Sequence, residues 1–148
     1  MKAMRYSGDI EVIAVCLEPG EPLLESIRAV IKQHDIQNGV VVSGVATLKK
    51  CRMHYINHTD FPPKDTFYEV EKPLEVGSIS GMIADYEPHL HIVIGCKDDK
   101  TWTGHLEEGS IVGYLAEICI LKFNGLQMSR KPDEKRKVKM LGPKTENP

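Results

Sequence analysis

The spacing of apolar residues divides the first part of the chain into short elements. Residues 10–17 are rich in β-branched side chains and run into a Glu-Pro-Gly sequence, which is typical of a buried strand that ends in a turn. In the next segment Leu23, Leu24, Ile27, Val30 and Ile31 recur at helical spacing. Pro22 suits a first helical position and Gly39 lies beyond the end, so the pattern predicts one helix here.

The following residues predict strands. Residues 40–46 and 51–56 are expected to form two strands, or one long strand bent near Gly44 and Leu48. A polar loop at 57–65 precedes a series of strand-like runs separated by turn residues, at 67–71, 74–83, 90–94, 102–106 and 111–123. Because strands dominate and one clear helix accompanies them, the pattern predicts an α+β fold with a mainly antiparallel sheet.

The composition changes after Met128. Residues 129–148 carry runs of charge and no apolar periodicity, so we expect a single domain at 1–128 followed by a charged segment or tail at 129–148. The basic cluster Lys135-Arg136-Lys137-Val138-Lys139 lies in this segment and is partly neutralised by Asp133 and Glu134. We expect it to be a solvated tail rather than a site for nucleic acid.

Composition and charge indicate an ordinary globular domain and argue against a membrane protein or a general nucleic-acid binder. The chain has 148 residues, of which 41% are hydrophobic and 27% charged, as in ordinary globular domains. Its 19 Lys and Arg against 21 Asp and Glu give a net charge of −2, too little positive charge for a general attraction to nucleic acid or anionic lipid. No apolar stretch approaches the roughly 20 residues of a membrane span, and the 4 cysteines include no Cys-x-x-Cys pair. We expect a cytoplasmic protein that binds no membrane.

Three of the 6 histidines lie close together in the sequence and are the main candidates for chemistry. His89 and His91 alternate with apolar residues, so on a strand both project from one face. The hairpin-like connection at 95–100 would bring His105 back on an adjacent antiparallel strand. Three imidazoles with an open position suit a catalytic or ligand-binding zinc. The alternative is that they are polar residues on a half-exposed sheet face; the other histidines are weaker candidates.

Glu117 is a second candidate. It interrupts an otherwise apolar strand, where a carboxylate is expected to be paired or functional. It could act as a general acid or base, or orient an imidazole. An ion pair, within the chain or across a subunit interface, explains it equally well.

Several motifs together resemble a known family. Ser43-Gly44-Val45-Ala46, Leu74-Glu75-Val76-Gly77, Pro88-His89-Leu90-His91 and Gly104-His105-Leu106-Glu107 occur in this order between about Ile10 and Arg130. This arrangement resembles the plants and prokaryotes conserved (PPC) domain in its stand-alone bacterial and archaeal form. The resemblance implies a curved antiparallel sheet, a homotrimer, and a divalent metal bound by the three matching histidines. It also implies a fold similar to that of acetolactate decarboxylase and of a zinc-dependent ester hydrolase.

Two functions remain open from this resemblance. The first is a metal site, with zinc the first choice, that binds or turns over a small carboxylate or carbonyl ligand; whether it catalyses is left open. The second is a DNA-binding or transcription-associated trimeric scaffold in which the metal is structural, because prokaryotic relatives carry a predicted DNA-binding label. In plants the domain is joined to AT-hooks, but this chain has no Arg-Gly-Arg-Pro core. We therefore expect weak or no binding of nucleic acid by this chain alone.

Overall fold

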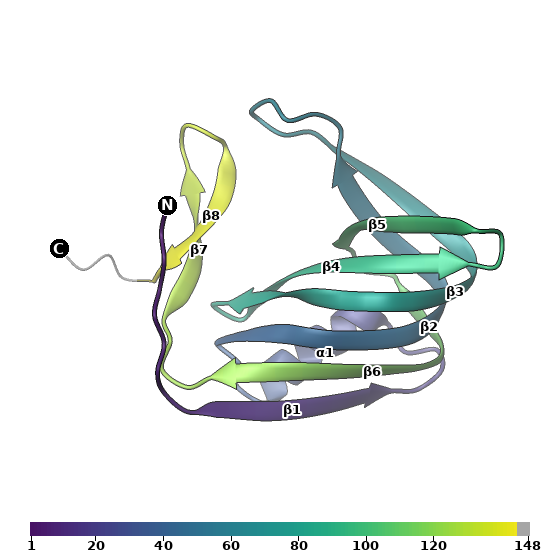
Figure 1. Ribbon diagram of the computed structural model, residues 1–148, viewed down its shortest axis with the longest axis horizontal. Helices are drawn as coiled ribbons and strands as arrows, with labels where there is room; N and C mark the ends of the chain where they lie inside the picture. Colours follow the sequence, from purple (N-terminus) through teal and green to yellow (C-terminus); the bar gives the residue numbers. More distant parts are fainter. Residues whose placement is uncertain (145–148) are drawn as a thin grey trace.

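A computed structural model describes residues 1–144 of the chain as one α+β domain (Figure 1). Its elements are β1 (Ile10–Leu17), α1 (Leu23–Gln33), β2 (Asn38–Ile56), β3 (Asp65–Ala84), β4 (Glu87–Cys96), β5 (Lys100–Leu106), β6 (Ile111–Phe123), β7 (Met128–Asp133) and β8 (Val138–Pro143). The predicted α+β class is confirmed. Within the described part, no helix has the length and apolar character needed to span a membrane.

The main sheet is antiparallel and strongly curved. Its six strands follow the order β1-β6-β2-β3-β4-β5, and β2 also pairs with β5 through His54 and His105. This second pairing is possible because β2 is long and bends away from the plane of its first half, as Figure 1 shows. Strands β2, β3, β4 and β5 therefore curl until β5 pairs with β2, which closes this part of the sheet on itself.

Helix α1 covers one face of this sheet (Figure 1). Its apolar residues Leu23, Ile27 and Ile31 are fully buried and belong to one core cluster with Leu90 and Ile92 of β4. The helix begins one residue later than predicted. Pro22 has an extended ψ of 125° and serves as the N-cap residue rather than the first helical residue.

Strands β2 and β3 are each continuous. For β2 the sequence left open two strands or one bent strand, and for β3 it predicted two separate runs, at 67–71 and 74–83. Leu48 pairs with Leu74 but Lys50 pairs with Glu71, so one residue of β2 opposes Lys72 and Pro73 of β3. This is a β-bulge, and a bulge tolerates proline because no ladder hydrogen bond is required of its nitrogen. The alternative of one long strand bent near Leu48 is therefore the correct one for β2.

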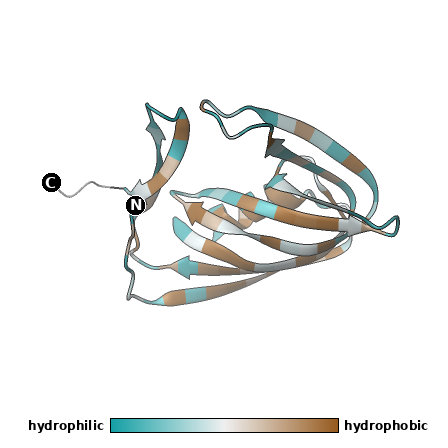
Figure 2. Ribbon diagram, turned by 45° about the horizontal axis from the view of Figure 1, so that its top comes forward, coloured by the Kyte–Doolittle hydropathy of each residue, from teal (hydrophilic) through white to brown (hydrophobic). Residues whose placement is uncertain are grey.

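The segment after Met128 is not the extended tail that its charge pattern predicted. It forms the hairpin β7–β8, closed by a hydrogen bond of 2.7 Å from the Lys137 amide to the Asp133 carbonyl. Met128 is 2% exposed and its amide donates to the Asn38 side chain at 3.1 Å, which anchors the hairpin to the main domain. Both apolar and polar residues occur along β8 (Figure 2), and the many charges obscure this pattern in the sequence. Residues 145–148 of the predicted tail lie outside the described residues.

Candidate metal centre

The structure brings the three predicted histidines together on the face of the sheet opposite α1. His89 and His91 project from β4, and His91 is directly opposite His105 of β5. The ring centroids are 5.5 Å apart for His89 and His91, 4.8 Å for His89 and His105, and 5.8 Å for His91 and His105. The alternation of β4 causes this arrangement, because Leu90 and Ile92 are drawn into the core on the other face.

A fourth imidazole, which the sequence reasoning ranked low, lies in the same cluster. His54 of β2 is opposite His105 in the β2–β5 pairing, and the two rings stack with centroids 4.5 Å apart. The two residues are about fifty positions apart in the chain, so no local pattern indicates their contact. Only the long-range pairing of β2 with β5 places them together.

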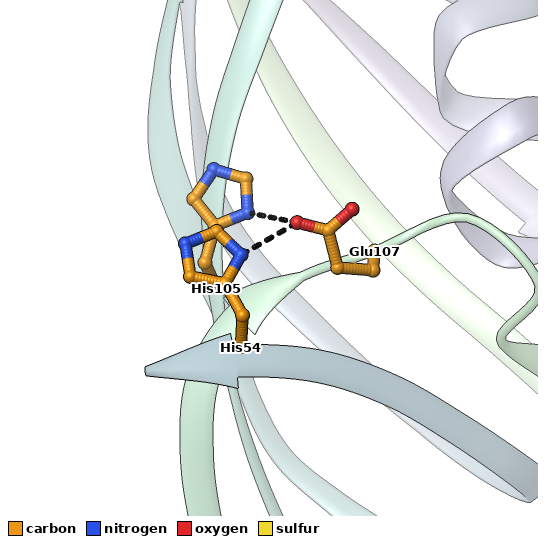
Figure 3. Close-up of side chains that lie close together, drawn as sticks. All are labelled: His54, His105 and Glu107. Carbon is orange, nitrogen blue, oxygen red and sulfur yellow. Dashed lines mark hydrogen bonds and ion pairs between the residues drawn. The ribbon is translucent and has the colours of Figure 1, made fainter. Parts of the chain in front are cut away.

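Glu107 joins two of these histidines through one carboxylate oxygen (Figure 3). Its Oε1 lies 2.6 Å from Nδ1 of His54 and 3.4 Å from Nδ1 of His105. Nδ1 of His105 also lies 3.0 Å from the carbonyl oxygen of Leu106. Candidate ligand atoms of His54, His105 and Glu107 all lie within 4.8 Å of one another, so this group could also hold a metal ion.

Two roles for Glu107 follow from this geometry, as a metal ligand or as a hydrogen-bond partner of the histidines. The 2.6 Å separation from His54 is a hydrogen-bond distance. Histidines that bind metals commonly donate their second ring N–H to a carboxylate or a backbone carbonyl. When Nδ1–H of His105 donates to the Leu106 carbonyl, Nε2 keeps the lone pair that a metal requires. The second role therefore suits the donor atoms better.

The electrostatics favour neutral rings in the cluster. Desolvation, followed by the positive charges of His105 and Arg130, lowers the pKa of His89 from 6.5 to about 4. Desolvation and then the nearby His54 lower the pKa of His105, while Glu107 acts in the opposite direction. Both lowered pKa values favour the unprotonated ring, which is the form that binds a metal.

The cluster opens into a cavity between the sheet and the C-terminal hairpin. The cavity has a volume of about 430 Å³ and contains His89 and His91 on the sheet side and Arg130 and Lys139 on the hairpin side. A neighbouring cavity of similar volume is lined by His89, His105 and the same two basic residues. A cavity of about 450 Å³ elsewhere, lined by residues that include Leu48 and Tyr114, contains no histidine and is not part of this centre.

Glu117 lies apart from the histidines. It is exposed on β6, opposite Val45 of β2, and three strand spacings separate β6 from β4 in the sheet order. At about 4.8 Å per spacing, the path along the curved sheet from β6 to β4 is roughly 14 Å. The structure therefore does not bring Glu117 into the histidine cluster of its own chain, and its predicted catalytic role stays a prediction.

Several solved structures have the same fold, and their names describe different roles. A metal-containing protein from Archaeoglobus fulgidus has a TM-score of 0.80 at 22% identity, over 95% of this chain and 98% of that chain. A protein from Pyrococcus horikoshii, named as a plant- and prokaryote-conserved protein, has a TM-score of 0.74 at 26% identity, over 94% and 96% of the two chains. One from Bacteroides thetaiotaomicron, named as a candidate DNA-binding protein, has a TM-score of 0.76 at 15% identity, over 98% and 99%.

The curated relatives are longer proteins. The bifunctional protein GlmU of a Synechococcus strain is 28% identical over 127 residues, which cover 86% of this chain and 20% of that protein. This chain therefore spans about a fifth of the length of the curated relatives it matches. The model of the Plants and Prokaryotes Conserved (PCC) domain, which is the PPC domain under its other abbreviation, matches residues 4–124. Since this match covers most of the chain and includes all four clustered histidines, the chain belongs to the Plants and Prokaryotes Conserved domain family.

Proposed function

We propose that this protein binds a divalent metal ion, with zinc the first choice, through His89, His91 and His105. An open coordination position would then accept a small carboxylate or carbonyl ligand. The observation that carries the proposal is the convergence of three imidazoles from two paired strands, with ring centroids no more than 5.8 Å apart. Three imidazoles and an open position form the usual ligand set of a catalytic zinc.

The surrounding residues support this ligand set. The Leu106 carbonyl and Glu107 lie on the Nδ1 side of His105, so they fix the ring with Nε2 available. Imidazole donors also suit nickel, iron, copper and cobalt, so the choice of zinc rests on the ligand type and the open position. The metal-containing protein from Archaeoglobus fulgidus adds support through its fold alone.

The residues of the chain define what the centre can do with a ligand. A bound metal supplies Lewis-acid polarisation of a carbonyl or carboxylate oxygen. Glu107 accepts the Nδ1 proton of His54 and thereby leaves His54 Nε2 able to accept a proton. Two groups are thus available for proton movement beside the ligand position, His54 and Glu107, and both come from this chain.

Elemental analysis of the purified chain tests the proposal. We expect about one divalent ion per chain, and loss of that ion when His89, His91 and His105 are all replaced by Ala. His34 and His58 lie outside the cluster, so their replacement by Ala is the matched control and should leave the metal content unchanged. Unchanged metal content in the triple variant would show that these histidines are not the site.

We also propose that the chain assembles as a homotrimer. The row of paired residues Val12, Leu121, Val40, Met82 and His89 crosses five strands on one face of the sheet, so the histidines share this face with β1, β6 and β2. The β1 to β2 half of this face exposes several apolar side chains, with Ile10, Val12 and Val45 at 52%, 68% and 45% exposed, and also the carboxylate of Glu117 opposite Val45. Exposed apolar patches of this kind mark subunit interfaces, and the family resemblance indicates copies of the same chain as the partner.

A DNA-binding scaffold with a structural metal is the second candidate function. The observation that favours it is the concentration of basic charge in the hairpin region, where residues 128–144 carry 7 Lys and Arg against 2 Asp and Glu. The Bacteroides thetaiotaomicron protein with the same fold is named for such a role. A net charge of −2 for the whole chain opposes it, so we expect weak binding that salt abolishes.

A further inference from the structure

The C-terminal hairpin carries two basic side chains to the histidine cavity. Arg130 of β7 and Lys139 of β8 both line it, together with His89 and His91. Figure 1 shows the hairpin beside the end of the sheet where β4 begins, which is the end that carries His89. The sequence indicated neither residue as part of the histidine site, because both lie in the segment predicted as a tail, and Lys139 was considered there only as one residue of a solvated basic cluster.

Arg130 is held in place by the main chain. Its guanidinium donates to the Met82 carbonyl at 2.8 Å and to the Glu87 carbonyl at 2.9 Å. A guanidinium has five N–H donors, so these two bonds leave three donors for a ligand. Its partial burial disfavours the charged form and lowers its pKa, although it stays protonated near neutral pH. The side chain is therefore both oriented and charged.

Arg130 and Lys139 form no ion pair within the described residues. The Glu87 carboxylate nevertheless acts to raise the pKa of Arg130, and Asp85 and Glu87 line the neighbouring cavity that the same two basic residues border. Three other basic residues of the hairpin region are in ion pairs: Arg136 with Asp133, Lys137 with Glu134, and Lys144 with Asp85. Among residues 1–144 no ion pair includes Arg130 or Lys139, and no carboxylate lines the cavity that they share with His89 and His91. Two cations that face a partly desolvated cavity without a carboxylate favour an anionic occupant.

The remainder of the lining defines the shape of that occupant. Met82, Met140 and Leu141 add apolar side chains to the same cavity lining. An anion that reached only the metal would leave Arg130 and Lys139 without a partner, and an anion at the hairpin would leave the open metal position unfilled. A short hydrocarbon chain with a charged group at each end satisfies both.

We infer that the hairpin makes the metal centre selective for small dicarboxylates. One carboxylate occupies the open metal position, and Arg130 and Lys139 bind the other through charge-assisted hydrogen bonds. The apolar residues contact the carbon chain between them. This inference rests on the proposed metal site and adds to it the class of ligand and the residues that select it.

Calorimetric titration of the zinc-loaded chain with succinate and with butyrate tests the inference. The two acids have the same number of carbons and differ in one carboxylate. We expect succinate to bind at least about tenfold more tightly, since a hydrogen bond to a charged group contributes about one tenfold factor or more. Malonate and glutarate, against propionate and valerate, give the preferred length of the carbon chain.

Substitutions in the hairpin locate the selectivity. Lys139→Gln should reduce the preference for succinate over butyrate by about tenfold without changing zinc content. Lys139→Arg should restore the preference, because it restores the charge. Lys131 is the matched control. It lies in the same hairpin, paired with Met140, the residue next to Lys139, and it does not line the cavity. Lys131→Gln should leave the preference unchanged.

The outcomes separate this inference from the proposed function. Equal affinities for succinate and butyrate in the zinc-loaded wild-type chain would overturn the dicarboxylate inference and leave the metal site standing. An equal loss of preference in Lys131→Gln and Lys139→Gln would also overturn it, because general charge would then explain the effect. A wild-type chain that binds no zinc would overturn both.

Discussion

The face of the sheet opposite α1 is divided into two regions with different surfaces. Across β3, β4 and β5 it carries imidazoles and borders a cavity with two basic residues. Across β1, β6 and β2 it carries exposed apolar residues such as Val12 and Val45. One row of paired residues connects the two regions on the same face of the sheet. The histidine half differs in its side chains, in the β2–β5 pairing and in the neighbouring hairpin.

This difference matches the two requirements of the proposed function, a metal centre and a subunit interface. A metal centre needs polar donors held by rigid neighbours, and paired strands supply them. A subunit interface needs apolar area that the single chain leaves exposed. Because the two regions are adjacent on one face, assembly through the apolar half would place a second copy of the chain close to the histidines.

A charge in the apolar half should have the largest effect. We expect Val12→Glu combined with Val45→Glu to convert a trimer into monomers, because the new carboxylates would be buried without partners. Light scattering measures the mass. Phe61→Glu is the matched control, since Phe61 is 59% exposed in the loop between β2 and β3, outside this face. A wild-type chain that is monomeric at micromolar concentration would contradict the proposed assembly.

Removing the carboxylate beside the histidines should weaken metal binding without abolishing it. We expect Glu107→Gln to lower zinc affinity about 10- to 100-fold, because the partner that fixes His54 and His105 loses its charge. A competition titration with a chromogenic chelator gives the affinity. Glu117→Gln serves as the control, since Glu117 lies three strand spacings from β4, and its zinc affinity should match the wild type. Equal affinities for Glu107→Gln and the wild type would exclude a supporting role for Glu107.

The lowered pKa of His89 predicts an acid-sensitive metal-free protein. The folded-state pKa is about 4 and the ordinary value is 6.5, so between these values the unfolded chain binds more protons. Stability therefore falls as pH decreases through this window, and the contribution is complete above about pH 6.5. Thermal melts of the metal-free chain measure it, and His89→Ala should show a shallower pH dependence. Identical slopes for the two proteins would contradict the assignment.

The smallest expected effect concerns nucleic acid. We expect duplex DNA to bind weakly at low salt and not measurably at physiological salt, because the main excess of Lys and Arg over Asp and Glu lies in the hairpin region and the whole chain has a net charge of −2. Fluorescence anisotropy with a labelled duplex measures this, and Lys131→Glu combined with Lys135→Glu should remove what binding there is. Sequence-selective binding in the nanomolar range at physiological salt would favour the DNA-binding scaffold instead.

The local part of the site was predictable from the sequence. Period-2 alternation placed His89 and His91 on one face, and the short connection after Cys96 placed His105 beside them. The resemblance to the family added the expectation of a metal. These features depend on neighbours in the chain, which a single sequence displays directly.

The remaining parts depend on contacts that a single sequence does not display. His54 reaches His105 through a pairing between distant strands, and Glu107 gains its partners from the same pairing. The sequence pattern divided β3 into two runs, at 67–71 and 74–83, but the bulge opposite β2 joins them into one strand. The hairpin was missed because its charges dominate the composition, although its anchor Met128 is nearly fully buried.

X-ray absorption at the zinc edge of the metal-loaded chain tests the central claim most directly. His89, His91 and His105 as ligands predict three imidazole nitrogens at about 2.0–2.1 Å with one oxygen ligand from solvent or a small anion. The same spectrum is expected for Glu107→Gln, because Glu107 then acts only through hydrogen bonds. A first shell of two imidazoles whose oxygen ligand disappears in Glu107→Gln would place the metal between His54, His105 and Glu107 and contradict the account.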